Sequence, residues 1–335
     1  MKILKSYKLR LYPTKGQKVF FNKTMGACRV IYNEMLWKLS KDYNENKKKY
    51  TLEEKYELFK QIKSKYEWMS NCDAQGLTQI RRDVDSAFRN FFKKITKYPK
   101  FKKKHEKNSY RNGHPYKGEF ITQINERYIK IPKVGLVKYR QDYDFTKLNI
   151  QKVYNITIER SKTNKYYCSI CMDVDIPEYE YTGEIIGIDL GIKDLLIDSN
   201  GEKYKNPKYQ SKFEKKIKHL QRLYSKKIKG SKNQEKARLK LAIAHEKLSN
   251  KRKDYLHKIT TKIIKENNII CIENLSVKNM MKNHHLAKSI QDASFGTLVS
   301  MLKYKATWNN RQIIEIGRFY PSSKTCNSCG YINKS

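Results

Sequence analysis

Ile185-Ile-Gly-Ile-Asp-Leu-Gly-Ile192 is a nearly continuous apolar run that a single carboxylate, Asp189, interrupts. Such a run predicts a β-strand that is buried on both faces of a sheet. A second run of the same kind, Ile269-Ile-Cys-Ile-Glu-Asn-Leu275, also contains one acid, Glu273. Because an unpaired charge inside a sheet is costly, both carboxylates need a partner. A divalent cation would serve both acids, whereas a helix cap or a lysine could serve either one alone.

Around these strands the apolar periodicity predicts an α/β layer. We expect a strand at Asp194–Asp198, a Lys-rich helical pair, and then a separate helix that contains Leu256 and Ile263. A helix from about Ser294 and a strand at Gln312–Ile316 complete the layer. Asp292 precedes the helix at Ser294, so we expect it to cap that helix.

The amino-terminal part of the chain has two different periods. Leu4–Pro13 alternates apolar and polar residues, which predicts a strand, and Thr14 is a helix cap. Apolar residues then recur at helical spacing to about Ile95, which indicates three or four helices. From about residue 116 to 176 the period returns to two, with a turn at Ser161–Asn164, and this predicts a β-barrel that the first strand joins.

The net charge of the 335 residues is +39, which indicates a polyanionic partner. The segment from Lys203 to Lys262 alone has 21 basic residues against four acids. Since 39% of residues are hydrophobic, the chain can build real cores and is not a disordered basic tail. No run reaches the roughly 18 apolar residues of a membrane helix, and no secretory signal is present. We therefore expect a cytoplasmic protein that binds phosphate-rich nucleic acid, with no membrane and no small-molecule substrate.

A Pro-marked loop alternates aromatic and basic residues, a composition that suits backbone contact and stacking on bases. Its aromatic residues could equally pin the loop to the protein. The candidate nucleic-acid contacts in this loop are Tyr98, Lys100, Phe101, Lys102, Lys103 and Lys104.

Two blocks, Gly187-Ile-Asp-Leu-Gly-Ile-Lys193 and Cys271-Ile-Glu-Asn-Leu275, resemble the first two catalytic blocks of a RuvC-type, ribonuclease-H-like nuclease domain. They are most similar to the version in the transposon-associated TnpB proteins, which are relatives of the type V CRISPR effectors. Further blocks occur in the order expected of that family: Leu9-Arg-Leu-Tyr-Pro13, Tyr98-Pro-Lys-Phe-Lys102, Ser294-Phe295 with Tyr304-Lys-Ala306, and Ser322-Ser-Lys-Thr-Cys-Asn-Ser-Cys-Gly330.

The resemblance implies an α+β multidomain fold. Residues 1–13 would form the first strand of a wedge-like β-barrel, 14–115 an inserted helical recognition domain, 116–180 the rest of the barrel, and 181–335 a RuvC-like domain. We expect a Lys-rich helical insertion at about 205–255 and an incomplete zinc-ribbon remnant at 322–335. The resemblance also implies a guide RNA that directs the protein to double-stranded DNA beside a short target-adjacent motif.

The resemblance assigns further residues. Asp189 and Glu273 would be two of three RuvC acids. The face of Gln75, Thr78, Gln79 and Arg82 would read the target-adjacent motif, with an ordinary exposed polar face as the alternative. The Lys-rich helices would contact guide RNA, with Lys215, Lys216 and Arg222 as candidates.

The chain ends at Ser335, before the second Cys pair and the third acid that the family pattern contains. Structural zinc is almost always four-coordinate, so Cys326 and Cys329 make half a site and zinc binding is expected to be weak or absent. Loss of one carboxylate should slow cleavage by on the order of 10³-fold or more. Mg²⁺ is expected only where nuclease activity remains.

Three functions follow as hypotheses. The first is a guide-RNA-directed DNA-binding protein without nuclease activity, similar to the nuclease-dead repressors related to TnpB, that forms an R-loop and is associated with the nucleoid of a prokaryote when bound. The second is an RNA-guided DNA endonuclease of a transposon with Mg²⁺-dependent RuvC cleavage. The third is a transposon remnant with only generic RNA affinity.

Overall fold

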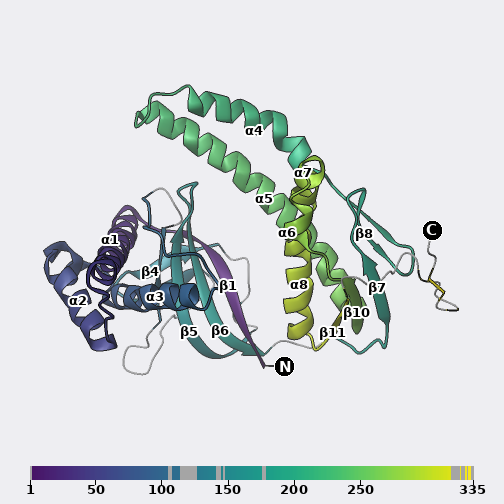
Figure 1. The fold of residues 1–335 in the computed structure, drawn as a ribbon, viewed down its shortest axis with the longest axis horizontal. Helices are drawn as coiled ribbons and strands as arrows, with labels where there is room; N and C mark the ends of the chain where they lie inside the picture. Colours follow the sequence, from purple (N-terminus) through teal and green to yellow (C-terminus); the bar gives the residue numbers. More distant parts are fainter. Residues whose placement is uncertain are drawn as a thin grey trace. The chain divides into compact units, whose positions relative to one another are not determined.

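The computed structural model describes residues 2–104, 108–113, 127–140, 145, 148–175, 179–317, 325, 329 and 331–332. The chain forms two compact units, Lys2–Ile176 and Pro177–Ser335. Each unit combines a sheet with helices, coloured purple to teal in the amino-terminal unit and teal to yellow in the carboxyl-terminal unit (Figure 1). None of the helices in the described ranges has the length and apolarity that a membrane span requires.

The amino-terminal unit contains a six-stranded antiparallel sheet with the order β2-β5-β6-β1-β4-β3. The long pairing of β1 with β6 runs from Lys2 opposite Asp175 to Leu11 opposite Tyr166. The predicted turn is confirmed, since the Asn164 N–H donates to the Ser161 carbonyl at 3.0 Å. The strands are β1 (Lys2–Tyr12), β2 (Asn108–Asn112), β3 (Tyr128–Ile131), β4 (Gly135–Tyr139), β5 (Asn149–Arg160) and β6 (Tyr166–Asp175).

One expectation about this unit differs from the structure, and a second is not tested by it. Residues 108–112 form β2, which pairs with β5, so the helical segment expected over 14–115 ends before this strand. The polar composition of β2 hides its alternation, in which only Tyr110 and Asn112 are buried. The sheet order runs from β2 to β3, and no pairing between these two strands occurs among the described residues. The closed barrel therefore remains a prediction.

The first two α-helices of this unit begin at capping boxes. The Thr14 hydroxyl accepts from the Gln17 N–H, and the Gln17 side chain accepts from the Thr14 N–H, as the sequence predicts for a cap at Thr14. Thr51 and Glu54 form the same arrangement at the next helix. The elements are α1 (Lys15–Asn46), α2 (Leu52–Ser64), the 3₁₀ helix η1 (Glu67–Asn71) and α3 (Ala74–Phe92).

The core of this unit includes the contact of α1 with the sheet. The completely buried Phe21 ring lies 6.0 Å from the Tyr166 ring and 6.4 Å from the Tyr110 ring, centroid to centroid. Beside it, Asn22 accepts hydrogen bonds from the Tyr166 hydroxyl at 3.0 Å and from the Arg160 guanidinium at 3.1 Å. Apolar and polar contacts thus fix α1 on the sheet.

Gly76, in the first turn of α3, packs against the buried Tyr110 ring. A β-carbon on Gly76 would lie 2.8 Å from Cδ2 of that ring, which is enclosed on all sides. Alanine normally stabilises a helix by about 0.5–1 kcal/mol relative to glycine, but overpacking a core costs about 1–3 kcal/mol. We expect Gly76→Ala to lower the free energy of unfolding by about 1–2 kcal/mol, measured by urea denaturation.

Gly26, within α1, provides the matched control. A β-carbon there would meet no atom within 4 Å, so only the helix preference for alanine remains. Gly26→Ala should therefore raise the free energy of unfolding by about 0.5–1 kcal/mol. Two substitutions with effects of the same sign would contradict the role assigned to the Tyr110 ring.

The carboxyl-terminal unit contains a five-stranded mixed sheet with the order β11-β10-β7-β8-β9. Strands β7 and β11 run parallel to β10 on either side, whereas β8 is antiparallel to β7 and to β9. The strands are β7 (Ile185–Asp189), β8 (Asp194–Asp198), β9 (Lys203–Lys205), β10 (Ile269–Glu273) and β11 (Gln312–Ile316). The predicted bounds of β8 and β11 are confirmed.

Five helices belong to this unit among the described residues: α4 (Tyr209–Ser225), α5 (Lys232–Glu266), α6 (Val277–Met280), α7 (His284–Ala293) and α8 (Phe295–Trp308). The apolar core joins the sheet to α5, α7 and α8. Its members include Ile186, Ile188, Ile270, Ile272, Leu256, Ile263, Ile290, Leu298 and Leu302.

Two expectations about this unit are wrong. Strand β7 is buried on one face only, since Ile186 and Ile188 are each 4% exposed while Ile185 is 60% exposed. The helix that contains Leu256 and Ile263 is not a separate element, because it is the last part of α5, one helix of 35 residues. The bounds of the Lys-rich insertion stay a prediction. No glycine or proline interrupts α5, so no local signal ends it earlier.

Candidate functional site

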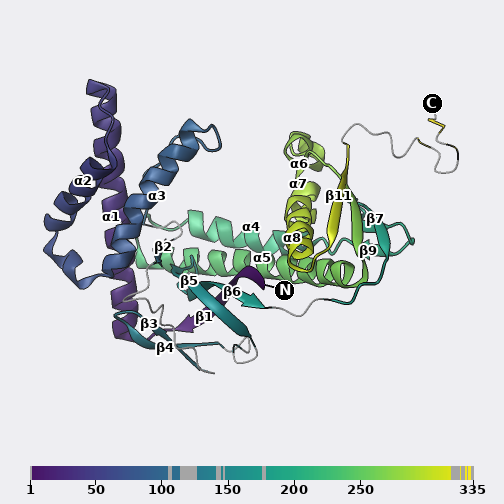
Figure 2. The ribbon, with the colours of Figure 1, turned by 90° about the horizontal axis from the view of Figure 1, so that it is seen from below.

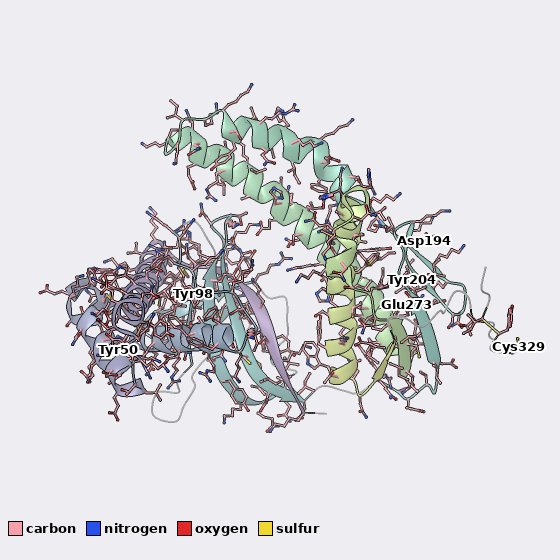
Figure 3. All side chains as sticks on the ribbon, in the orientation of Figure 1. Tyr50, Tyr98, Asp194, Tyr204, Glu273 and Cys329 are labelled. Carbon is pink, nitrogen blue, oxygen red and sulfur yellow. The ribbon has the colours of Figure 1, made fainter. Side chains whose placement is uncertain are left out.

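The two strand acids end adjacent parallel strands. Ile188 lies opposite Ile272 in the β7–β10 pairing, and Asp189 and Glu273 each follow by one residue. Matching positions on neighbouring strands point to the same face, about 4.8 Å apart. Since both isoleucines are buried, the carboxylates project from the opposite face, where Asp189 is exposed and Glu273 is half-buried. The structure thus brings together the two acids that the sequence selects, with Glu273 labelled in Figure 3.

The turn after Asp189 requires a glycine. A β-carbon on Gly191 would lie 2.8 Å from the carbonyl oxygen of Asp194. The Gly191 N–H donates to the Leu195 carbonyl at 3.3 Å, and Asp189 pairs with Ile197 on the returning strand. The glycine of the Asp-Leu-Gly sequence therefore lets the chain reverse tightly and holds Asp189 at the strand end.

The chemistry of the Asp189–Glu273 pair fits Mg²⁺. This ion takes oxygen ligands and is usually bound by one or two carboxylates together with waters and substrate phosphates. The pair offers two carboxylates on one face with access from solvent. Within the described part of the chain, no group of three or more His, Cys, Asp or Glu side chains is placed to hold a metal. The fit is therefore to a two-carboxylate site.

Asp292 caps a different helix from the one expected. It lies near the end of α7, where both carboxylate oxygens accept from the Gln210 N–H at 3.0 Å. Its Oδ1 also accepts from Arg252 of α5 at 3.0 Å. Gln210 is in the first turn of α4, whose own N-cap residue makes no side-chain hydrogen bond. Asp292 therefore satisfies α4 instead of α8 and ties α4, α5 and α7 together.

A second carboxylate anchors the same three-helix junction. Glu214 of α4 accepts from Lys218 at 2.8 Å and from Lys288 of α7 at 2.5 Å. Hydrogen bonds from these two ammonium groups lower the pKa of Glu214 to about 2. The root of the α4–α5 hairpin is thus held by charge as well as by packing.

The basic residues predicted to contact RNA lie on the outer surface of α4. Lys215, Lys216 and Arg222 are exposed, and α4 has no buried residue. Where the structure describes the chain, none of these three side chains forms an ion pair with an acid. Their charges therefore face solvent, as contact with a polyanion requires.

The face predicted to read a DNA motif lies on α3. Gln75 and Arg82 are exposed, whereas Thr78 and Gln79 are half-buried. The Thr78 hydroxyl donates to the Ala74 carbonyl at 3.0 Å and is partly occupied by its own helix. The four residues are thus on the accessible side of α3, as their spacing predicts.

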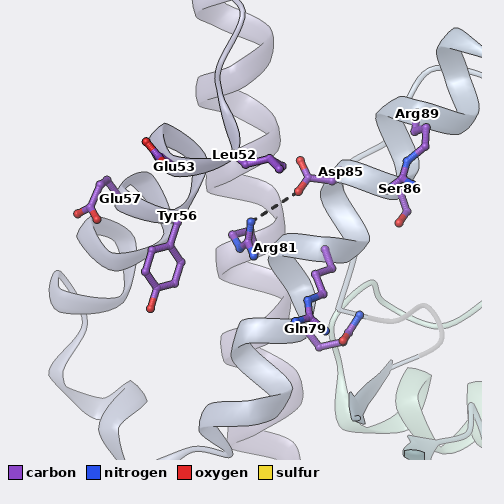
Figure 4. Close-up of a pocket in the computed structure, with 10 residues that line it drawn as sticks. Leu52, Glu53, Tyr56, Glu57, Gln79, Arg81, Asp85, Ser86 and Arg89 are labelled. Carbon is purple, nitrogen blue, oxygen red and sulfur yellow. Dashed lines mark ion pairs between the residues drawn. The ribbon is translucent and has the colours of Figure 1, made fainter. Parts of the chain in front are cut away.

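Two of these residues, Gln79 and Arg82, line a cavity of about 590 Å³ between α2 and α3 (Figure 4). Tyr56 of α2 contributes an aromatic ring, and the Arg81 guanidinium lies 5.6 Å from its centroid. Arg81 also forms a 3.9 Å ion pair with Asp85. Carboxylates of Glu53, Glu57 and Asp85 also line the cavity, so its wall offers both hydrogen-bond donors and acceptors. This combination suits the edge of a base.

The basic loop after α3 is pinned to α1 at two points. The hydroxyls of Tyr98 and Ser40 lie 2.6 Å apart. The Asn33 side chain donates to the Lys102 carbonyl at 3.0 Å and accepts from the Lys102 N–H at 2.8 Å. Asn33 and Ser40 are seven residues apart and lie on one side of α1; this spacing is the only sequence signal for them. The observed contact gives Tyr98 the pinning role, although its ring remains 46% exposed.

The other loop residues divide into two groups. The Lys102 ammonium lies 3.9 Å from the centroid of the Tyr32 ring, and desolvation lowers the pKa of Lys102. This contact directs its charge toward the protein. The exposed candidates with no contact that holds them to the protein among those described are Lys100, Phe101 and Lys103. Lys104 is also exposed, but its carbonyl accepts a hydrogen bond from the Asn108 side chain at 2.9 Å.

The candidate zinc ligands fall at the edge of the described chain. Cys326 lies outside the described residues, and Cys329 is exposed. An antiparallel bridge joins Thr325 to Ile332 around them. The zinc expectation therefore stays a prediction.

Three family models match the chain. The OrfB_IS605 model, described as "Probable transposase", matches residues 169–284; its helix-turn-helix domain matches residues 1–48; and the TNB domain of Cas12f1-like proteins matches residues 295–335.

Two curated relatives are 30% identical to the chain. One, from Streptomyces pristinaespiralis, is named "Putative RNA-guided DNA endonuclease", and the alignment covers 98% of this chain and 81% of the relative. The other, InsQ of Escherichia coli strain K12, has the same name and is aligned over 100% and 85%. A solved complex of Cas12f1 with sgRNA and target DNA superposes with a TM-score of 0.60 at 14% identity, covering 99% of this chain and 92% of the other.

The fold and the paired strand acids define a multidomain α+β protein with a RuvC-like transposase domain. The chain belongs to the TnpB family, because relatives at 30% identity align with nearly all of it. The resemblance drawn from the six sequence blocks is confirmed.

Proposed function

We propose that the protein binds a guide RNA and, directed by it, binds and cleaves double-stranded DNA. The observation that carries this proposal is the register of β7 and β10, which sets Asp189 and Glu273 side by side. The relatives named as RNA-guided DNA endonucleases support the activity, and the sgRNA and target DNA in the similar Cas12f1 complex support the partners.

Asp189 and Glu273 would hold Mg²⁺, which supplies charge stabilisation and an activated water for hydrolysis of a phosphodiester. The contribution of the chain is to fix the two carboxylates. Strand β10 is held between β7 and β11, and the Gly191 turn keeps the end of β7 in place. This rigidity supports cleavage because a misplaced ligand would misplace the attacking water.

Recognition of nucleic acid would use the exposed basic residues of α4, the loop after α3 and the cavity of Figure 4. In a guided system, base pairing of RNA with DNA reads the sequence, and the protein reads backbone shape and a short motif. Gln79 and Arg82 are the residues that we assign to the motif.

A nuclease-dead repressor is the second candidate. This function requires that no third acid joins Asp189 and Glu273 to form a complete catalytic site. The position of Asp292 favours it, because the Gln210 N–H and Arg252 already occupy the carboxylate of this acid. Such a protein would use the same RNA and DNA surfaces and would obstruct transcription by holding an R-loop.

One experiment tests both candidates. The protein is purified with its co-expressed RNA and incubated in Mg²⁺ with DNA that matches the guide or with a scrambled sequence. We expect specific binding and cleavage of the matched DNA, and both should move to a new site when the guide is changed. Binding that ignores the guide would reject guided function and would favour a remnant with generic affinity. Guided protection without cleavage would assign the repressor.

A further inference from the structure

A cavity of about 490 Å³ opens on the helical side of the amino-terminal unit, distinct from the cavity of Figure 4. It lies between α1, α2 and α3, and Figure 2 shows α1 and α3 diverging toward their carboxyl-terminal ends. Its volume lies within the range of about 300–1,000 Å³ that is usual for small-ligand sites. Aromatic side chains form most of its wall: Tyr43, Tyr50, Phe88, Phe91, Phe92 and Tyr98.

Contacts within the protein position aromatic side chains of this wall without a ligand. The Tyr98 ring stands edge-on to Phe91 at 5.2 Å and to Phe88 at 5.9 Å, centroid to centroid, and the Ser40 hydroxyl holds its far end. Tyr50 hydrogen-bonds to Asp42, and burial together with this bond raises the pKa of Tyr50 to about 12. Figure 3 labels Tyr50 and Tyr98. The Tyr98 ring is therefore held in place by its neighbours, and Tyr50 is a neutral surface.

The rim of the cavity contains an accessible ring. Phe92, the last residue of α3, is 67% exposed, although it contacts Phe91 at 5.3 Å. Its ring therefore extends the aromatic lining of the cavity to the solvent, where a base could stack on it. Ile95, three residues later, is equally exposed at 67% but does not line the cavity.

The positive charge of the lysines at the rim favours an anionic partner. Lys48, Lys49 and Lys55 line the cavity. Lys48 pairs with Glu54 at 3.2 Å and Lys55 with Asp85 at 2.9 Å. Lys49 is exposed and forms no ion pair among those described, so its charge faces solvent at the rim. Lys93 and Lys94, which follow Phe92 in the sequence, are also exposed. Aromatic rings bordered by lysines are the combination that binds an unstacked base together with its phosphate.

We propose that this cavity binds one unpaired nucleotide of a nucleic-acid strand, with the base on the aromatic wall and the phosphate at the lysine rim. This inference rests on the proposed function only for the source of the strand, which is either the RNA or the opened DNA. It assigns a stacking role to Phe92 and a supporting role to Tyr98, whose hydroxyl is already engaged.

Phe92→Trp gives a direct readout of stacking. Each purified variant is titrated with a short single-stranded RNA, the same sequence as single-stranded DNA, an abasic strand of equal length, and a blunt duplex. We expect single strands that carry bases to quench the fluorescence of the introduced tryptophan. The parent protein, which has three native tryptophans, gives the reference signal. The RNA and DNA arms identify the source of the nucleotide. Equal quenching by the abasic strand or by the duplex would overturn the proposal.

Phe92→Ala measures the contribution to affinity. It should weaken binding of the base-containing single strand by about tenfold, with little effect on the abasic strand. Ile95→Ala, which removes an equally exposed apolar side chain outside the cavity, should leave both affinities unchanged. Equal effects of the two variants would reject the site. That result is distinguishable from failure of the proposed function, which is read from guide-dependent binding of matched DNA by the parent protein.

Discussion

Replacement of Asp189 by alanine should abolish guided cleavage of DNA while leaving guided binding within about twofold of the parent protein. The expected loss of rate is on the order of 10³-fold or more, because both carboxylates would be needed to hold Mg²⁺, which would stabilise the negative charge of the transition state. Glu273→Ala should have the same effect, and Asp189→Asn should be as inactive, since it keeps the shape and loses the charge. The measurement is single-turnover cleavage with saturating protein–RNA complex.

Asp254→Ala is the matched control for this series. Asp254 lies on α5 of the same unit, is exposed, and pairs only with the neighbouring Lys258 among the contacts described. Its removal should leave the cleavage rate unchanged. If Asp189→Ala cleaves as fast as Asp254→Ala, the pair of strand acids is not the catalytic centre.

The second large effect concerns salt. A protein that neutralises six to ten phosphates loses about 10³ to 10⁵ in affinity between about 50 and 200 mM salt, because binding releases counterions. With a net charge of +39, we expect the protein to fall within this range for RNA. The triple substitution of Lys215, Lys216 and Arg222 by glutamine should reduce the slope of log affinity against log salt by about two to three, measured by filter binding.

A second triple substitution gives the control for net charge. Lys218, Lys258 and Lys262 each form an ion pair with an acid, at 2.8, 2.8 and 2.7 Å. Their replacement by glutamine changes the net charge of the protein by the same amount as the first triple. We expect a smaller change in slope, since these charges are already compensated. Equal changes would mean that only the total charge matters and that α4 presents no particular contact surface.

The local pattern of apolar residues predicts the two strands that carry the acids. The apolar runs at 185–192 and 269–275 predict β7 and β10. Since both runs belong to one predicted α/β layer, both acids are expected to end strands of one sheet. Pattern could not tell that Ile185 is exposed, because a run of isoleucines looks the same whether one or two layers cover it. The parallel register that aligns Asp189 with Glu273 is a property of the assembled sheet.

Contacts between residues that are distant in sequence do not follow from local pattern. Local capping rules predict that Asp292 caps the helix that follows it, but Asp292 binds α4, whose first turn is 82 residues away in the chain. The pinning of Tyr98 by Ser40 is separated by 58 residues, and the aromatic cavity depends on it. Such pairs depend on how the helices pack, which the spacing of apolar residues within one helix does not specify.

Helix α5 has a mechanical consequence. One face of its last third, with Leu256, Ile259, Ile263 and Ile264, is buried in the core, whereas its first twelve residues, Lys232 to Ile243, include none that is buried. A helix of this length spans roughly 50 Å, and the apolar core holds α5 at its carboxyl-terminal end. A tilt of a few degrees at the buried end of α5 would displace its other end by several ångströms. A force on the α4–α5 hairpin would therefore act at Asn267, which follows α5 and leads into β10, the strand that ends in Glu273.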